Sequence, residues 1–360
     1  MKIITVIGAR PQFIKAAVVS REIAERKNEI TEIIVHTGQH FDTNMSDIFF
    51  TELDIPKPYY HLGVGGGTHG ENTGRMLERI EQVLIKEKPS FVLVYGDTDS
   101  TLAATIASVK LHIPVAHVEA GLRSFNRKMP EEINRVLTDH ASEILFAPTD
   151  IAVKNLEKEG IAKEKIKKVG DVMYDAALYY GAKVNNAEEV LSNLNIISKK
   201  YILLTLHRAE NVDNKDRLCA ILEGLIHYPY NIIWPLHPRT KKMIESFGIS
   251  IPAQIKVIDP VGYLDMIVLE KHAEIIATDS GGVQKEAYFH KVPCITMRDE
   301  TEWKELVQCG ANIITGANTQ NIIDALKYAS NIGIGIFKDP LYGNGNTAIE
   351  IVDTLLKPRK

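Results

Sequence analysis

The sequence predicts an α/β protein of two Rossmann-like domains, each a doubly wound parallel sheet. Apolar runs of four to seven residues alternate with helical patterns from one end of the chain to the other. Strict alternation of strand and helix indicates parallel sheets that are covered on both faces. The apolar runs number eleven, too many for one comfortable open sheet, and 360 residues suffice for two domains with separate cores.

The expected elements follow from this pattern in chain order. Strands are expected at residues 3–7, 30–36, 90–95, 114–118, 143–147, 201–206, 230–235, 255–258, 274–277, 293–296 and 312–314. Helices are expected at residues 11–26, 68–86, 100–111, 130–141, 213–226, 283–290, 319–329 and 346–356, several with Pro, Ser, Thr or Asp near their starts.

The domain boundary is expected in the polar stretch 183–200, which is rich in Asn and Lys and is the best candidate for a linker. We therefore assign residues 1–185 to an N-terminal domain and 186–345 to a C-terminal domain. Residues 346–360 form a terminal helix that could pack on either domain, and we assign it to the first.

Composition excludes several classes of function. A hydrophobic content of 45% and a charged content of 24% are those of an ordinary globular protein, and a net charge of -4 argues against a general nucleic-acid binder. The three cysteines lack C-x-x-C spacing, and the histidines lack a metal-binding pattern, so we predict no metal site. We expect a cytoplasmic protein because no signal peptide or membrane-spanning run is visible.

One strand, loop and helix unit has the features of an anion site. An apolar run from residue 274 ends at Asp279-Ser280, Gly281-Gly282 permit a tight turn, and a helix follows. A hydroxyl, bare backbone amides and a helix N-terminus together suit a phosphate or diphosphate. Glu286 lies on the same helix, where its carboxylate could accept hydrogen bonds from ribose hydroxyls. The structural alternative is that Ser280 merely caps the helix.

Other predicted strands also end in polar residues, where ligands bind in open parallel sheets. Each residue has a structural alternative: Asp97 could cap the next helix, and Glu119 could pair with Arg123. Six predicted strands end in this way, and so many polar strand ends are not explained by coincidence. The candidates are Arg10 and Lys15 after the first strand, Gln39 with His40, Asp97, Glu119, His207 and His237.

Common nucleotide motifs do not fit. Gly8-Ala-Arg-Pro-Gln12 is not G-x-G-x-x-G, and the second strand lacks an acidic ribose ligand, which disfavours NAD. The glycine cluster of residues 63–70 lacks the Gly-Lys-Ser/Thr ending of a Walker loop. We read it as a loop that could close over a ligand, or as a flexible connection.

The set of motifs resembles the non-hydrolysing UDP-N-acetylglucosamine 2-epimerases, with the two-domain GT-B architecture and the active site in the cleft between the domains. The resemblance spans about residues 3–356. It is carried, in this order, by Gly8-Ala-Arg-Pro-Gln-Phe-Ile-Lys15, Thr37-Gly-Gln-His40, Gly96-Asp-Thr98, His117-Val-Glu-Ala-Gly-Leu-Arg123, Pro130-Glu-Glu-Ile-Asn-Arg135, His207-Arg-Ala-Glu210 and Thr278-Asp-Ser-Gly-Gly-Val-Gln-Lys-Glu286.

The resemblance implies roles for individual residues. Asp97, Glu119 and Glu131 are implied as acid and base groups, and His207 joins the catalytic set. The UDP-sugar is implied to bind at Arg10, Lys15, Gln39, Arg135, His207, His237, Ser280, Gly281, Gly282 and Glu286. The resemblance also implies a homodimer, a UDP-sugar substrate, no nucleic-acid or membrane partner, and no cofactor.

Some residues depart from the family pattern. Trp303 stands where the family often has arginine, and Phe41 stands where many members have arginine, which removes support for a second, regulatory UDP-sugar site. Val261 and Met266 replace a Gln and a Phe near the uracil end. These variants resemble the branch that acts on UDP-2,3-diacetamido-2,3-dideoxyglucuronate in surface-polysaccharide synthesis, so the exact sugar stays open.

The expected chemistry is elimination of UDP to a 2-acetamidoglycal followed by re-addition, which interconverts UDP-N-acetylglucosamine and UDP-N-acetylmannosamine. It requires a base over one sugar face, an acid over the other, and cations for the leaving diphosphate. The alternatives are a hydrolysing epimerase, a GT-B glycosyltransferase and a non-catalytic sugar-nucleotide sensor.

Overall fold

The computed structural model describes residues 1–39, 52–337 and 340–357 and divides the chain into two compact units. The first unit comprises Met1–Tyr179 with Pro340–Lys360, and the second comprises Tyr180–Asp339. The two boundaries assigned from the sequence, 185/186 and 345/346, each lie six residues after the corresponding boundary between the units. Each unit is described below by itself.

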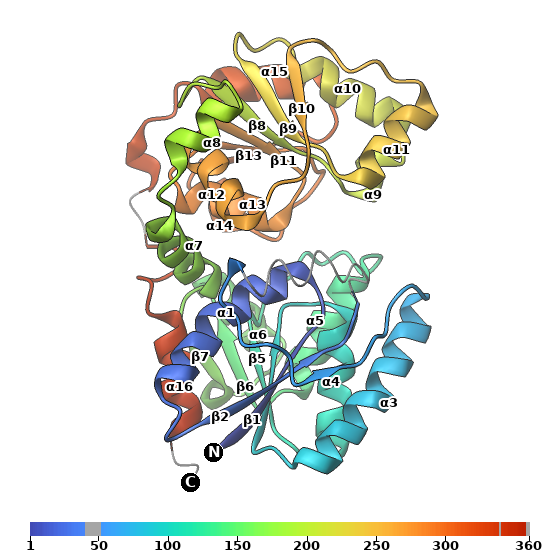
Figure 1. Ribbon diagram of the computed structural model, residues 1–360, viewed down its shortest axis with the longest axis vertical. Coiled ribbons are helices and arrows are strands. Elements are labelled where there is room, and N and C mark those ends of the chain that lie inside the picture. The colour runs from blue at the N-terminus through green and yellow to red at the C-terminus, as the bar shows by residue number, and fades with distance from the viewer. Residues whose placement is uncertain (40–51, 338–339, 358–360) are drawn as a thin grey trace. The chain divides into compact units, whose positions relative to one another are not determined.

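A seven-stranded sheet with the order β3-β2-β1-β4-β5-β6-β7 forms the centre of the first unit, and every neighbouring pair is parallel (Figure 1). Its strands are β1 (Lys2–Ile7), β2 (Thr31–His36), β3 (Tyr60–His61), β4 (Phe91–Tyr95), β5 (Val115–Val118), β6 (Ile144–Ala147) and β7 (Ile166–Lys168). Its helices are α1 (Arg10–Glu25), α3 (His69–Glu87), α4 (Asp99–Lys110), α5 (Pro130–Ala141), α6 (Asp150–Lys158), most of α7 (Val172–Lys183) and α16 (Thr347–Leu356).

A six-stranded parallel sheet with the order β10-β9-β8-β11-β12-β13 forms the centre of the second unit. Its strands are β8 (Tyr201–Thr205), β9 (Asn231–Pro235), β10 (Ile255–Ile258), β11 (Ile275–Thr278), β12 (Cys294–Thr296) and β13 (Asn312–Ile314). Its helices are α8 (Ala187–Asn193), α9 (Ala209–Val212), α10 (Lys215–Leu225), α11 (Pro238–Phe247), α12 (Tyr263–His272), α13 (Gly281–Phe289), α14 (Lys304–Gln308) and α15 (Thr319–Ala329).

The two sheets repeat one topology. In both, the first strand lies at the centre, the second and third are added on one side, and the fourth and later strands on the other. The order of addition therefore reverses between β1 and β4, and again between β8 and β11. Ligands bind at such switch points because the loops there separate toward opposite faces of the sheet.

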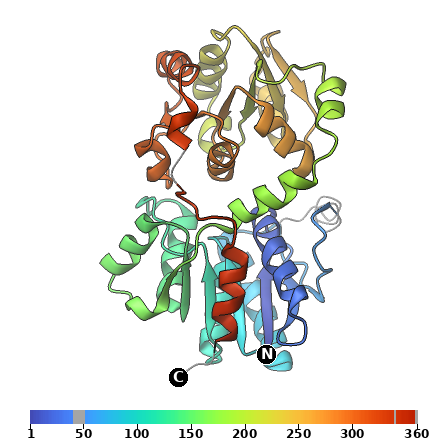
Figure 2. The ribbon, with the colours of Figure 1, turned by 90° about the vertical axis from the view of Figure 1, so that its left-hand side faces the viewer.

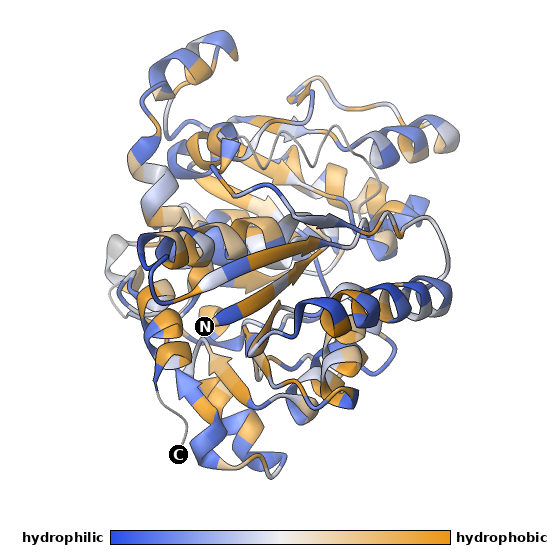
Figure 3. Ribbon diagram, turned by 60° about the horizontal axis from the view of Figure 1, so that its bottom comes forward, coloured by the Kyte–Doolittle hydropathy of each residue, from blue (hydrophilic) through white to orange (hydrophobic). Residues whose placement is uncertain are grey.

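Buried apolar side chains on both faces hold each sheet. In the first unit, Ile4 and Val6 of β1 and Val92 of β4 share a core with Met76 and Ile80 of the amphipathic helix α3. Figure 3 shows the strands coloured mostly hydrophobic, whereas many helices carry both colours. The predicted strands all exist because such apolar runs fit only the interior of a covered parallel sheet.

The sequence analysis missed the two edge strands of the first sheet and the helices α6, α7, α9, α11, α12 and α14, and it misjudged one segment. Strands β3 and β7 have two and three residues and include exposed positions, so they carry little apolar signal. The predicted linker 183–200 is wrong, because α8 forms within it and packs against α12 of the second unit. Val190, Leu191 and Leu194 form a helical apolar stripe there, hidden among polar neighbours.

The terminal helix belongs to the first unit. Helix α16 packs against α1, and Figure 2 shows the two side by side in red and blue. An ion pair between Arg26 and Asp353 joins the same two regions at the surface. In the described part of the chain, no helix is long and apolar enough to cross a membrane.

Candidate functional site

The corner where β4 and β5 end brings together the first predicted site residues. Tyr95 pairs with Val118 in the sheet, so Gly96-Asp97 and Glu119 leave neighbouring strands at the same level. Gly96 has a φ of +62°, and a Cβ atom there would lie 3.2 Å from both Lys15 Nζ and Glu119 Oε2. Glycine at this position therefore allows the backbone to approach the two charged side chains closely.

Lys15 and Glu119 form a buried ion pair at this corner. Lys15 comes from the second turn of α1, and the exposed fractions of the two side chains are only 10% and 7%. A carboxylate in such a place needs a cationic partner because burial alone would favour its neutral form. The partner suggested by the structural alternative, Arg123, binds Asp139 and Glu159.

Asp97 pairs with another cation, Arg135. The guanidinium of Arg135 also lies 3.1 Å from Glu132, so it links α5 to the loop after β4. Thr98, not Asp97, caps α4, since its hydroxyl accepts a hydrogen bond from Thr101 N. The structural alternative for Asp97 is therefore wrong. Its carboxylate is 29% exposed and pairs with Arg135.

Glu131 and its neighbour Glu132 differ in environment. Glu131 is exposed in the first turn of α5, and the hydrogen bonds and ion pairs described for the chain do not join it to Asp97 or Glu119. Glu132 is buried, accepts hydrogen bonds from Ser124 N and Phe125 N, and pairs with Arg135. Sequence reasoning missed this structural role, since two adjacent glutamates carry no signal of which one faces inward.

Gln39 lies at the end of β2 and contacts the start of α4. Its Oε1 accepts hydrogen bonds from Ser100 N at 3.1 Å and Ser100 Oγ at 2.6 Å. Gly8 permits this close packing, because a Cβ there would lie 1.9 Å from Thr37 Oγ1. The structure places Arg10 at the first position of α1 but does not describe its side chain, and His40 and Phe41 lie outside the described residues.

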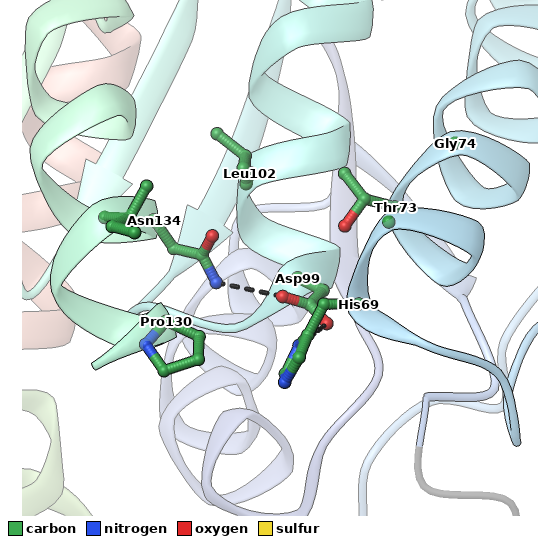
Figure 4. Close-up of a pocket in the computed structure, with 9 residues that line it drawn as sticks. His69, Thr73, Gly74, Asp99, Leu102, Pro130 and Asn134 are labelled. Carbon is green, nitrogen blue, oxygen red and sulfur yellow. Dashed lines mark hydrogen bonds and ion pairs between the residues drawn. The ribbon is translucent and has the colours of Figure 1, made fainter. Parts of the chain in front are cut away.

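A pocket of about 350 Å³ lies next to this corner, where α3, α4 and α5 begin. His69 Nδ1 lies 2.8 Å from Asp99 Oδ2, and Asn134 donates to Asp99 Oδ1 at 3.1 Å (Figure 4). Asn134 also donates to the backbone oxygen of Asp97, so the pocket shares a wall with the carboxylate corner. No sequence motif selects these residues, which come from three separate helices.

The strand, loop and helix predicted to bind an anion are present in the second unit as β11, the loop at Asp279-Ser280 and α13. Ser280 occupies the N-cap position of α13 but, within the described chain, makes no side-chain capping hydrogen bond. The capping alternative is therefore wrong. A Cβ atom on Gly282 would lie 3.9 Å from Ser280 Oγ and 4.0 Å from Glu286 Oε2, so hydroxyl and carboxylate flank one glycine at the helix start.

The buried carboxylate of Asp279 binds the backbone that follows the neighbouring strand β8. Its carboxylate accepts hydrogen bonds from His207 N and Arg208 N after β8 and from Asn211 Nδ2. The imidazole of His207 is 49% exposed, with Nδ1 3.3 Å from Asp279 Oδ1. His207 and the helix start at Ser280 therefore lie at the same switch point. His237 is placed differently, because its ring accepts the backbone N–H of Arg239 and caps α11.

The segment that departs from the family pattern covers the start of α13. A Cβ on Gly281 would lie 2.5 Å from Glu302 Oε1 and 3.6 Å from Trp303 Nε1. Glu302 pairs with Arg298 at 2.9 Å, and the ring of Trp303 lies 4.2 Å from the Lys285 ammonium. Trp303 is thus buried beside the start of α13, a position that the sequence alone did not indicate.

Comparison with known proteins identifies the family. The family model for UDP-N-acetylglucosamine 2-epimerase matches residues 22–356. A UDP-2,3-diacetamido-2,3-dideoxy-D-glucuronate 2-epimerase of Pseudomonas aeruginosa is 54% identical over 364 residues, covering 99% of this chain and 100% of the relative.

Solved structures agree. The crystal structure of the Methanocaldococcus jannaschii UDP-GlcNAc 2-epimerase, in complex with UDP-GlcNAc and UDP, is 50% identical, with a TM-score of 0.91 and 99% of each chain covered. That of the Neisseria meningitidis UDP-GlcNAc 2-epimerase bound to UDP-GlcNAc is 34% identical, with a TM-score of 0.90, covering 99% of this chain and 100% of the other. With its two parallel-sheet domains of GT-B type, this chain belongs to the UDP-N-acetylglucosamine 2-epimerase family.

Proposed function

We propose that this protein interconverts UDP-N-acetylglucosamine and UDP-N-acetylmannosamine by eliminating UDP and adding it back. The observation that carries the proposal is the corner at β4 and β5, where Asp97 and Glu119 each pair with a cation. Two carboxylates at adjacent strand ends supply an acid and a base close to one another.

The chemistry accounts for the need for both groups. The hydrogen on C2 of an acetamido sugar is not acidic, so a base can remove it only as the bond from C1 to the diphosphate oxygen breaks. The electron pair of the C–H bond then forms the C1–C2 double bond, and the pair of the C–O bond leaves with UDP. Protonation of C2 from the opposite face and attack of UDP on C1 complete the inversion.

Glu119 pairs with Lys15 and Asp97 pairs with Arg135, so each carboxylate has a cation beside it. An ionised carboxylate is the form required of the base. Glu131 and His207 remain candidates for the other proton transfers. Substitution of each carboxylate in turn will show which one acts on which face of the sugar.

We propose that the diphosphate binds at the start of α13. The helix dipole and the amides of Gly281 and Gly282 suit an anion, and the Ser280 hydroxyl adds a donor. We propose that Glu286, on the same helix, accepts hydrogen bonds from the ribose hydroxyls, and that Arg10 and Lys15 are further ligands of the UDP-sugar.

Proton NMR of the purified protein with UDP-N-acetylglucosamine in D2O tests the proposal. We expect UDP-N-acetylmannosamine with deuterium at C2, without added metal or cofactor. Release of free N-acetylmannosamine and UDP would instead assign the hydrolysing reaction. Binding without turnover of this or any related nucleotide sugar would indicate a sensor, and sugar transfer to an acceptor a glycosyltransferase.

A second candidate substrate is UDP-2,3-diacetamido-2,3-dideoxyglucuronate, favoured by the 54% identical relative that bears this name. It has the same acetamido group at C2, so the elimination is unchanged. Equal concentrations of the two nucleotides in one tube separate the candidates, because their consumption ratio equals the ratio of kcat/KM. Preference for the diacetamido uronate by more than about 10-fold would assign that substrate.

We also propose a homodimer located in the cytoplasm. Both expectations rest on the resemblance and the sequence alone. Light scattering coupled to size exclusion measures the mass directly, against 40.2 kDa for one chain. Fractionation of the source cells tests the location.

A further inference from the structure

A buried histidine beneath the carboxylate corner carries an inference about how the corner is held. His117 lies on β5, two residues before Glu119, and none of its side chain is exposed. Its Nε2 lies 2.7 Å from the backbone oxygen of Gly96, the residue before Asp97. Its Nδ1 lies 2.7 Å from Oδ1 of Asp139 on α5.

The two hydrogen bonds decide the protonation of the ring. A backbone oxygen can only accept a hydrogen bond, so Nε2 must carry a proton. If Asp139 is ionised, Nδ1 must also carry a proton, because a carboxylate oxygen can only accept a hydrogen bond. Burial alone would raise the pKa of Asp139, but its hydrogen-bonding partners lower it. Two of them favour the ionised carboxylate whatever the charge of His117, because Oδ2 accepts hydrogen bonds from the Arg123 guanidinium at 2.7 Å and from the Gly121 N–H at 3.0 Å. Both ring nitrogens are then donors, and the ring is an imidazolium.

The surrounding charges are balanced. Asp139 also pairs with Arg123 at 2.7 Å, and Arg123 forms a bidentate pair with Glu159. The positive charges of His117 and Arg123 thus alternate with the negative charges of Asp139 and Glu159. Across Gly96, the Lys15–Glu119 pair is likewise neutral. A buried charge persists only when it is paired in this way.

The backbone at this corner requires such support. Glu119 has a φ of +73°, a conformation that costs a non-glycine residue about 1–3 kcal/mol unless its surroundings enforce it. Asp139 reaches both sides of Glu119, because it binds His117 through Oδ1 and accepts the Gly121 N–H through Oδ2 at 3.0 Å. The N–H groups of Glu119 and Ala120 both donate to the Phe146 oxygen.

We propose that His117 is a positioning residue that is held as an imidazolium by Asp139 and that fixes the Gly96 carbonyl, and through it Asp97 and Glu119, in the geometry the reaction needs. The carboxylate roles rest on the proposed function, whereas the proton on His117 does not. The ring does not touch the substrate in this proposal, so its contribution is to the placement of the two carboxylates.

Nitrogen-15 NMR of histidine-labelled protein tests the protonation. The His117→Gln variant assigns the signals among the 12 histidines, and we expect both ring nitrogens of His117 to have imidazolium shifts at pH 7.5. Asp139→Asn should convert them to those of a neutral tautomer. A neutral ring in the wild-type protein, or an unchanged imidazolium in Asp139→Asn, would overturn this part of the proposal. If Asp139→Asn fails to fold, the wild-type spectrum assigned with His117→Gln still decides the protonation.

Kinetics test the positioning. In His117→Gln we expect kcat to fall about 100-fold while KM stays within about 2-fold, since misplacement of about 1 Å has effects of this size. The control is His140→Gln, on the same helix as Asp139 but 46% exposed, which should leave kcat unchanged. A folded His117→Gln protein with wild-type kcat would overturn the proposal.

Backbone NMR separates failure of this inference from failure of the proposed function. The amide signals of Asp97 and Glu119 should shift in His117→Gln and stay in place in His140→Gln, whatever the substrate. Unchanged signals in His117→Gln would contradict the positioning role. Inactivity of the wild-type protein on both nucleotide sugars would contradict only the proposed function.

Discussion

The two units share one strand order but use the end of the equivalent strand in opposite ways. In the first unit, β4 is followed by Gly96-Asp97, and the Thr98 side chain caps helix α4. In the second unit, β11 is followed by Asp279-Ser280, and no side-chain cap of Ser280 is described for α13. The aspartates also differ, because Asp97 is partly exposed and Asp279 is fully buried.

The comparison shows how one topology supports two kinds of site. A capped helix has its first amides satisfied, which leaves the loop side chains, here carboxylates, to do the chemistry. An uncapped helix keeps its amides and dipole available for a ligand anion. We therefore propose that the first unit supplies the proton-transfer groups and that the helix start of the second unit binds the diphosphate.

The largest expected effect is loss of catalysis without loss of UDP binding. Asp97→Asn and Glu119→Gln each remove a carboxylate, so kcat should fall by about 10³-fold or more, while the Kd for UDP, measured by calorimetry, should stay within about 2-fold. Asp150→Asn, on an aspartate whose side chain is 71% exposed, is the matched control. Survival of kcat together with loss of UDP binding in Asp97→Asn or Glu119→Gln would contradict the division between the units.

Stability toward acid should also differ between the units. Burial, with the charges of Lys271 and Lys199, lowers the pKa of His290 to about 4, so between about pH 6.5 and 4 the unfolded second unit binds a proton that the folded unit does not. Stability is therefore lost as the pH falls through this window, by up to about 3 kcal/mol. The lowered pKa of Asp139 has its effect only below about pH 4, where the first unit loses stability.

The positions of the tryptophans allow the acid unfolding of the second unit to be measured separately. Both tryptophans, Trp234 and Trp303, lie in the second unit, so fluorescence reports on that unit, whereas circular dichroism reports on both. On acid titration in moderate urea, the fluorescence transition should occur at higher pH than the completion of the dichroism change. His290→Gln should remove the difference. Coincident transitions in the wild type would mean that the units unfold together.

A smaller effect is expected at the anion site. In Gly281→Ala the added Cβ must displace the Glu302 carboxylate, which Arg298 holds, so UDP affinity should fall about 10-fold with little change in the proton-transfer groups. Gly333→Ala adds a Cβ with no described atom within 4 Å and serves as the control in the same unit. Equal UDP affinity in both variants would argue that the helix start does not bind the diphosphate.

The smallest effect concerns Trp303, which is buried beside the same helix start. A double-mutant cycle with Lys285→Met and Trp303→Phe should give a coupling energy of about 1 kcal/mol in urea unfolding followed by circular dichroism, because the buried ammonium lies over the ring. A coupling energy of zero would mean that the contact is packing alone.

The sequence by itself determined the fold class and predicted where the site residues lie in it. Consecutive apolar residues can be buried only in covered parallel strands, and polar residues after such strands must meet at one edge of the sheet. This reasoning found all strands of the second sheet and both switch points, including Asp97, Glu119 and Ser280. It failed for α8, whose apolar stripe is short and set among lysines and asparagines.

Only the tertiary structure decided which side chains pair. Lys15 and Glu119 are 104 residues apart, and nothing local to either one specifies the other. The same holds for Asp97 with Arg135, for the choice of Glu132 over Glu131 as the buried glutamate, and for the link from His117 to Gly96. Local periodicity sets the elements, but ion pairs and ring protons depend on distances that exist only once the sheet has formed.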